Sequence, residues 1–166
     1  MSEHRMPEPW LQGLTLDVDP VLAPVLFALQ QVREDLAAIP IEDVWHPISG
    51  IPPLGFQLTH IAGSLDRLTT YLEGGELTEA QLAFLQAERE PGASREQLNA
   101  LVKASLERTE NAIRRIDPGT YAHPRYVGRR RIPTTVIGLA IHIAEHTQRH
   151  CGQAITTSKL LDANRF

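Results

Sequence analysis

Four stretches of helical periodicity, separated by breaks rich in proline and glycine, restrict most strongly what this chain can fold into. In each stretch the apolar residues recur at spacings of three and four, which places them on one face of an α-helix. The stretches cover residues 19–39, 54–73, 94–116 and 133–160. Loose alternation occurs only in residues 120–132, which we read as an extended loop or hairpin. The pattern therefore predicts an all-α four-helix bundle.

Two further segments complete the predicted organisation. Thr78 followed by Gln81 has the pattern of a capping box, so we expect a short extra helix to begin there. Residues 1–18 show no sustained period and form an N-terminal arm. The helical bundle domain is then predicted to span residues 19–166.

Composition excludes several classes of protein. The 166 residues are 42% hydrophobic and 22% charged, which is typical of one ordinary globular domain. A formal net charge of -4 argues against a nucleic-acid binder. No apolar run approaches the length of a membrane span, and the N-terminus lacks the apolar core of a signal peptide, so we expect a cytoplasmic protein. A single cysteine, Cys151, excludes an internal disulfide.

Histidines recur at a four-residue step in the last helix, at His142, His146 and His150. They share one face of a helix that is otherwise largely apolar in its first half, so we expect the stripe to be interior or to line a cleft. A His-x-x-x-His pair directs two nitrogens at a common ion. A third ligand must come from another helix, and His60 is the best candidate because it lies off the apolar stripe of the second helix. Taken alone, His60 also fits a hydrogen-bonded or half-exposed histidine.

Together these two motifs resemble those of the DinB/YfiT-like family of metalloproteins. The match is carried by His60 in LTHIAGSLDRL and by His146 and His150 in HIAEHTQRHCGQ. A cysteine stands where the family often has a basic residue, and the Gly-Gln that follows is kept. The resemblance covers about residues 20–160. It implies an up-down-down-up bundle in which His60, His146 and His150 bind a divalent metal ion, with zinc or nickel as the best-suited metals.

The resemblance also implies an activity. Relatives include bacillithiol- and mycothiol-dependent transferases and isomerases, so the first expectation is an enzyme that activates a low-molecular-weight thiol for transfer or isomerisation. Arg67, two turns beyond His60, is then a candidate catalytic contact for an anionic substrate. The alternatives are a metal-dependent hydrolase, with Glu145 as the catalytic base, and a non-enzymatic metal-binding stress-response protein. Homodimerisation stays open, and neither nucleic acid nor membrane is expected as a partner.

Other residues near these motifs have two interpretations each. His142 is either a supporting partner of the metal ligands or a simple helix residue, and Glu145 and Gln153 compete for the supporting role. Cys151 is interpreted as a small buried apolar residue, because it points about 100° away from His150. The arginine-rich segment, residues 125–131, is either a solvated loop or a collar that attracts an anionic substrate.

Overall fold

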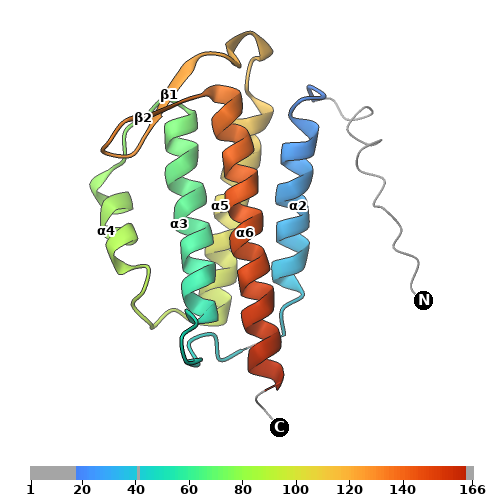
Figure 1. Ribbon diagram of the computed structural model, residues 1–166, viewed down its shortest axis with the longest axis vertical. Coiled ribbons are helices and arrows are strands. Elements are labelled where there is room, and N and C mark those ends of the chain that lie inside the picture. Colours follow the sequence, from blue (N-terminus) through green and yellow to red (C-terminus); the bar gives the residue numbers. More distant parts are fainter. Residues whose placement is uncertain (1–17, 41, 164–166) are drawn as a thin grey trace, which may run out of the picture.

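The computed structural model describes residues 18–40 and 42–163, and four long helices lying side by side make up its body (Figure 1). Helices α3 and α5 run in one direction along the bundle, and α2 and α6 run in the other. The predicted all-α, up-down-down-up four-helix bundle is confirmed. The predicted arm lies outside the described residues except for Val18. The long helices are α2 (Ala23–Ala37), α3 (Leu54–Leu72), α5 (Arg95–Arg114) and α6 (Val136–Ala163).

A short helix, α4 (Glu79–Ala87), lies beside α3 within the connection between α3 and α5. Since α3 and α5 are parallel, the chain must return along the bundle between them, and α4 forms part of that return. The predicted capping box is present, with both hydrogen bonds between Thr78 and Gln81. None of the nine described residues of α4 is buried. Phe84 in the middle of α4 and Glu88 just past its end both lie close to Gly63 of α3.

The core lies between the four long helices and follows the predicted apolar faces. Ile61 and Leu65 of α3 are fully enclosed, as are Leu29 of α2, Leu106 of α5 and Ile143 of α6. Trp45, in the loop before α3, covers one end of this core. Its indole N–H donates to a carbonyl in the loop before α5, Ala93 O, at 2.8 Å. The apolar interior fixes the relative positions of α3 and α6, which carry the candidate site.

Two helices begin later than the sequence pattern predicted. The last helix begins at Val136, because Pro133 and the two threonines after it continue an extended strand, as β-branched residues favour. Thr135 then caps the helix, since its hydroxyl accepts from the backbone N–H of Gly138 at 3.1 Å. Residues 20–22 form a turn, in which the backbone N–H of Val21 donates to Asp19 Oδ1, and helix α2 begins after it at Ala23.

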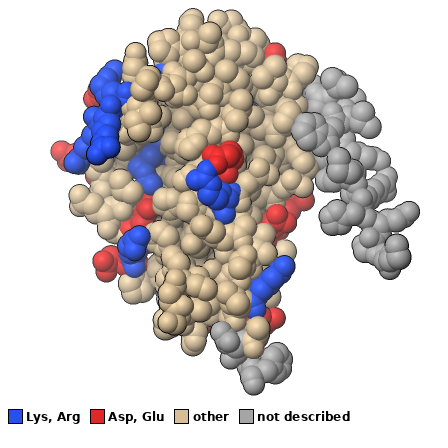
Figure 2. Space-filling model, in the orientation of Figure 1, with Lys and Arg blue, Asp and Glu red and all other residues tan. Residues whose placement is uncertain are grey.

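An antiparallel hairpin, β1 (Pro124–Val127) with β2 (Ile132–Thr135), crosses the end of the bundle where α6 begins. Figure 2 shows basic side chains gathered at the edge where this hairpin lies. Arg125 Nε donates to Leu72 O at the C-terminal end of α3, at 2.7 Å. Leu72 is twelve residues beyond His60, which is about 18 Å along a helix. The arginine-rich segment therefore lies at a different level of the bundle from His60.

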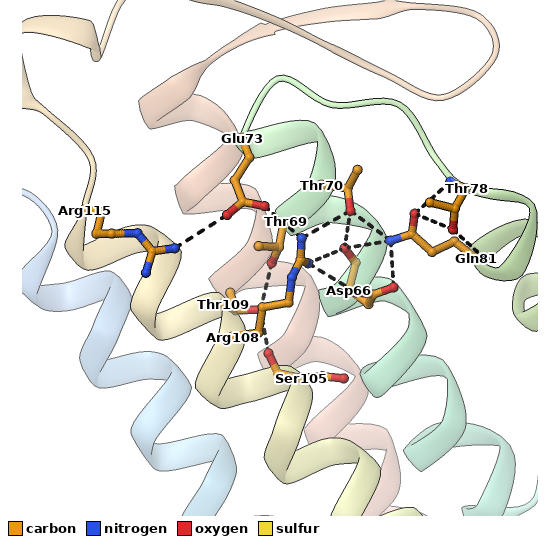
Figure 3. A network of polar contacts seen from close by, with 10 residues as sticks. All are labelled: Asp66, Thr69, Thr70, Glu73, Thr78, Gln81, Ser105, Arg108, Thr109 and Arg115. Atoms are coloured by element: carbon orange, nitrogen blue, oxygen red, sulfur yellow. Dashed lines mark hydrogen bonds and ion pairs between the residues drawn. The ribbon is translucent and has the colours of Figure 1, made fainter.

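A network of polar side chains joins α3, α5 and the start of α4 (Figure 3). Gln81 Nε2 donates to Asp66 Oδ2 at 2.7 Å and to Thr70 Oγ1 at 2.8 Å. Arg108 forms ion pairs with Asp66 at 3.2 Å and with Glu73 at 2.8 Å. We call these five residues the structural network. It fastens the N-terminal end of α4 to two long helices.

Candidate metal centre

Three histidines from two helices meet between α3 and α6. His60 comes from α3, and His146 and His150 come from successive turns of α6. Their ligand nitrogens all lie within 4.8 Å of one another, and all three residues are half-buried. We call them the histidine cluster. Residues predicted from two motifs 86 positions apart are thus brought together by the tertiary structure.

The spacing of the cluster fits a tetrahedral metal ion. The Nε2 atoms of His60 and His146 are 3.3 Å apart. Zinc–nitrogen bonds of about 2.0 to 2.1 Å at tetrahedral angles place two ligand nitrogens about 3.3 to 3.4 Å apart. Three imidazoles are also the donor set of catalytic zinc sites, in which a fourth position takes water or substrate. The residues present therefore fit a divalent cation such as zinc.

In two of the imidazole rings the Nδ1 atom, on the side away from the centre of the cluster, contacts a side chain that the sequence pattern did not predict. Glu88 Oε2 lies 2.8 Å from His60 Nδ1, and Gln57 Oε1 lies 3.0 Å from His150 Nδ1. Both partners are buried, with exposed fractions of 4% and 3%. These contacts leave the Nε2 atoms of both histidines for the centre of the cluster. Gln57 lies three residues before His60 in the same helix, so a search one turn around each predicted ligand could have found it.

Burial favours the neutral form of the two α6 histidines of the cluster. The pKa of His146 is lowered to about 4, first by burial and then by the neighbouring imidazoles of His150 and His60. The pKa of His150 is also lowered, first by burial and then by His60. Neutral imidazole nitrogens carry the lone pairs that bind a metal ion. At neutral pH His146 and His150 are therefore in the protonation state that a cation requires.

The remaining polar residues of the α6 stripe lie toward the surface. His142 Nδ1 is 3.2 Å from Glu145 Oε2, and Glu145 also forms an ion pair with Arg149. About half of the side-chain surface of Glu145 is exposed, at 49%. His142 remains next to the cluster, with its ring centroid 5.5 Å from that of His146. Glu145 is thus engaged by two neighbours on its own helix.

Arg67 is buried beside the cluster. Its Nη1 donates to Glu88 Oε1 at 2.6 Å, and the residue is 8% exposed. Gly63 makes this arrangement possible, because a Cβ at that position would lie 2.6 Å from Glu88 Oε1 and 2.8 Å from Arg67 Nη1. The side chains that approach Gly63 from α4 and its C-terminal end are Phe84 and Glu88.

A comparison with protein-family models gives one match, to the DinB superfamily, over residues 28–154. The match covers most of the chain and includes the whole histidine cluster. The chain belongs to the DinB superfamily. No curated protein and no solved structure matches it at a significant level.

A groove lies next to the cluster of this DinB-superfamily chain. Its volume is about 460 Å³, and its apolar lining includes Phe56 and Leu160, with Gln57 and Arg149 as polar members. Two of these residues also touch the cluster. Gln57 contacts His150, and the ring of Phe56 stacks on that of His60 with centroids 5.6 Å apart. The groove is therefore continuous with the walls of the histidine cluster.

Cys151, next to His150 in the sequence, is packed in the core. Cys151 is 3% exposed and belongs to the hydrophobic core, as predicted. Burial raises its pKa to about 12, with a smaller contribution from Asp35 of α2. It therefore faces away from the cluster.

Among the described residues, no helix combines the length and apolarity that crossing a membrane would need.

Proposed function

We propose that this DinB-superfamily chain is a metal-dependent enzyme that activates a small thiol at the histidine cluster and transfers it to an electrophilic substrate. The convergence of the three imidazoles, with a separation of 3.3 Å between two Nε2 atoms, is the observation that carries the proposal. When bound there, a divalent cation such as zinc or nickel would lower the pKa of a coordinated thiol. The thiol would release its proton to solvent, and its sulfur would bond to the electrophilic carbon as the leaving group departs with its bonding electrons. In an isomerase the adduct would rearrange instead.

In this proposal the protein's own residues position the cation and shield part of the cluster from water. His60, His146 and His150 would hold the cation, and a site with three protein ligands would leave room for the sulfur. Gln57 keeps the ring of His150 in place. The stacked ring of Phe56 shields one side of His60 from water.

The adjoining groove supports a substrate with an apolar body and an anionic end. Its apolar lining area suits the body, since ligand sites are mostly apolar with few polar groups. Arg149 lies on its wall and offers a guanidinium to a carboxylate or phosphate. Glu145 holds Arg149 in the absence of such a group. Direct catalytic roles for Arg67 and Glu145 stay predictions, as do a cytoplasmic location and a homodimer.

Thiol-dependent turnover tests the proposal. Protein loaded with zinc or nickel is mixed with a chromogenic electrophile and a panel of low-molecular-weight thiols. We expect at least one thiol to be consumed together with the electrophile by the wild type. The matched variants are His146→Ala, which removes a proposed ligand and should abolish turnover, and His142→Ala, which should retain it. Absence of turnover with every cellular thiol, in protein shown to contain metal, would contradict the proposal.

A further inference from the structure

Helix α4 contributes one buried residue to the region of the cluster, and it lies just past the end of the helix. Glu88 is 4% exposed, whereas none of the nine described residues of α4 itself is buried. The other end of α4 is fastened by Gln81 of the structural network. Glu88 is therefore the point at which this exposed helix reaches the bundle interior.

Burial of a carboxylate is costly unless both oxygens have partners. Here each oxygen has its own partner: Oε1 accepts from Arg67 Nη1 at 2.6 Å, and Oε2 lies 2.8 Å from His60 Nδ1. The buried carboxylate of Glu88 therefore joins Arg67 to a histidine of the cluster.

The contact determines which nitrogen of His60 faces the cluster. A carboxylate oxygen accepts, so the Nδ1–H of His60 donates and its Nε2 carries the lone pair. That Nε2 is the atom 3.3 Å from His146 Nε2. Metal-binding histidines typically donate their other N–H to such an outer carboxylate, which fixes the ring and raises its basicity.

We infer that Glu88 is the positioning residue of His60, that Arg67 fixes Glu88, and that α4 thereby completes the metal site. The inference rests on the metal-binding part of the proposed function. In this arrangement Arg67 acts through Glu88. A helix without buried residues is thereby linked to the affinity of the centre for its ion.

Zinc affinity and the visible spectrum of the cobalt-loaded protein test this role. Competition with a chromophoric chelator should show zinc binding about 10- to 100-fold weaker in Glu88→Ala than in the wild type. Glu88→Gln keeps one oxygen that can accept from His60 but has no second oxygen to accept from Arg67. Its zinc affinity should therefore lie between those of the wild type and Glu88→Ala. Arg67→Ala should weaken binding as well. The cobalt absorption bands should shift in Glu88→Ala, because the orientation of one ligand ring changes.

Glu90→Gln is the matched control, since Glu90 is exposed two residues further along the chain. It should bind zinc like the wild type. Wild-type affinity and a wild-type cobalt spectrum in Glu88→Ala would overturn the inference. If that variant does not fold, the same result in Glu88→Gln overturns it. A wild type that binds no metal would instead refute the proposed function, so the two failures are distinguishable.

Discussion

Helix α3 carries two polar regions that differ in how their members are paired. The structural network combines two carboxylates, a hydroxyl, an amide and a guanidinium. Arg108 pairs with Asp66 and Glu73, and Gln81 donates to Asp66 and Thr70 (Figure 3). In the histidine cluster, three chemically identical imidazoles direct nitrogens at one another. Opposite groups satisfy each other without help. Three imidazole nitrogens that converge on one point do not, because lone pairs that face one another need a shared proton or a cation.

The difference separates stabilisation from function. The structural network is partly exposed, with 39% of the Arg108 side chain and 40% of that of Asp66 accessible, and it fastens one helix to two others. The cluster is half-buried and is supported from behind by two side chains that are almost fully buried. Disruption of the first should cost folding free energy. Disruption of the second should cost metal affinity.

The largest expected effect is the loss of metal-dependent stabilisation in His146→Ala. A ligand that binds only the folded state at 100 times its Kd adds about 2.7 kcal/mol to the free energy of unfolding. We expect zinc to raise the melting temperature of the wild type and to leave that of the variant unchanged. Thermal unfolding with and without zinc measures this. An equal zinc-induced shift in both proteins would mean that the cluster is not the metal site.

Gly63→Ala should affect both regions, because Gly63 is where α4 approaches α3. Its Cβ would lie 2.6 Å from Phe84 Cε1 and 2.6 Å from Glu88 Oε1, so these buried or half-buried side chains must move. We expect a loss of about 1 to 3 kcal/mol in the free energy of unfolding and weaker zinc binding. Denaturant unfolding and chelator competition measure the two effects.

Gly152→Ala is the matched control for that variant. Gly152 is also helical, but no neighbouring atom lies within 4 Å of an added Cβ. Alanine there should stabilise the fold by about 0.5 to 1 kcal/mol through its helix propensity. Equal effects of the two substitutions would show that the approach of α4 to Gly63 is unimportant.

Arg108→Ala should change stability alone. Removal of ion pairs to two partly exposed carboxylates should lower the free energy of unfolding by about 1 kcal/mol. Zinc affinity should stay at the wild-type value, because Arg108 touches no member of the cluster or of its supports. Lys103→Ala, at a single exposed pair of 4.0 Å with Glu107, should have almost no effect. A large loss of zinc affinity in Arg108→Ala would show that the structural network also supports metal binding, which would contradict the separation of the two regions.

The smallest effect on the metal site is expected at Cys151, despite its place next to His150 in the sequence. Burial raises the pKa of its thiol to about 12, so the reactive thiolate is scarce at neutral pH. A thiol reagent at pH 8 should modify the folded protein much more slowly than the unfolded one, and Cys151→Ala should bind zinc normally. Rapid labelling of the folded protein, with loss of zinc, would contradict the assignment of Cys151 to the core.

Periodicity predicted the helices well because an apolar face of period 3.6 is a local property. The boundaries shifted where extended residues competed with a helix start, as at Pro133 before α6. The candidate ligands His60, His146 and His150 were found from their spacing and from family resemblance. The sequence pattern did not predict Glu88 and Gln57, because an acidic residue in the charged segment after a helix and an amide within an apolar helix look ordinary in sequence.

The sequence by itself determined the helical segments, their apolar faces and which histidines share one side of the last helix, because these depend on residues within a few turns of each other. Only the tertiary structure decided that His60 lies opposite His146, and that the burial of Glu88 links α4 to this point. Such contacts join segments 28 and 86 residues apart, and they form only when the apolar core has brought the helices together. The spacing of nitrogens that suits a metal ion is therefore a consequence of packing.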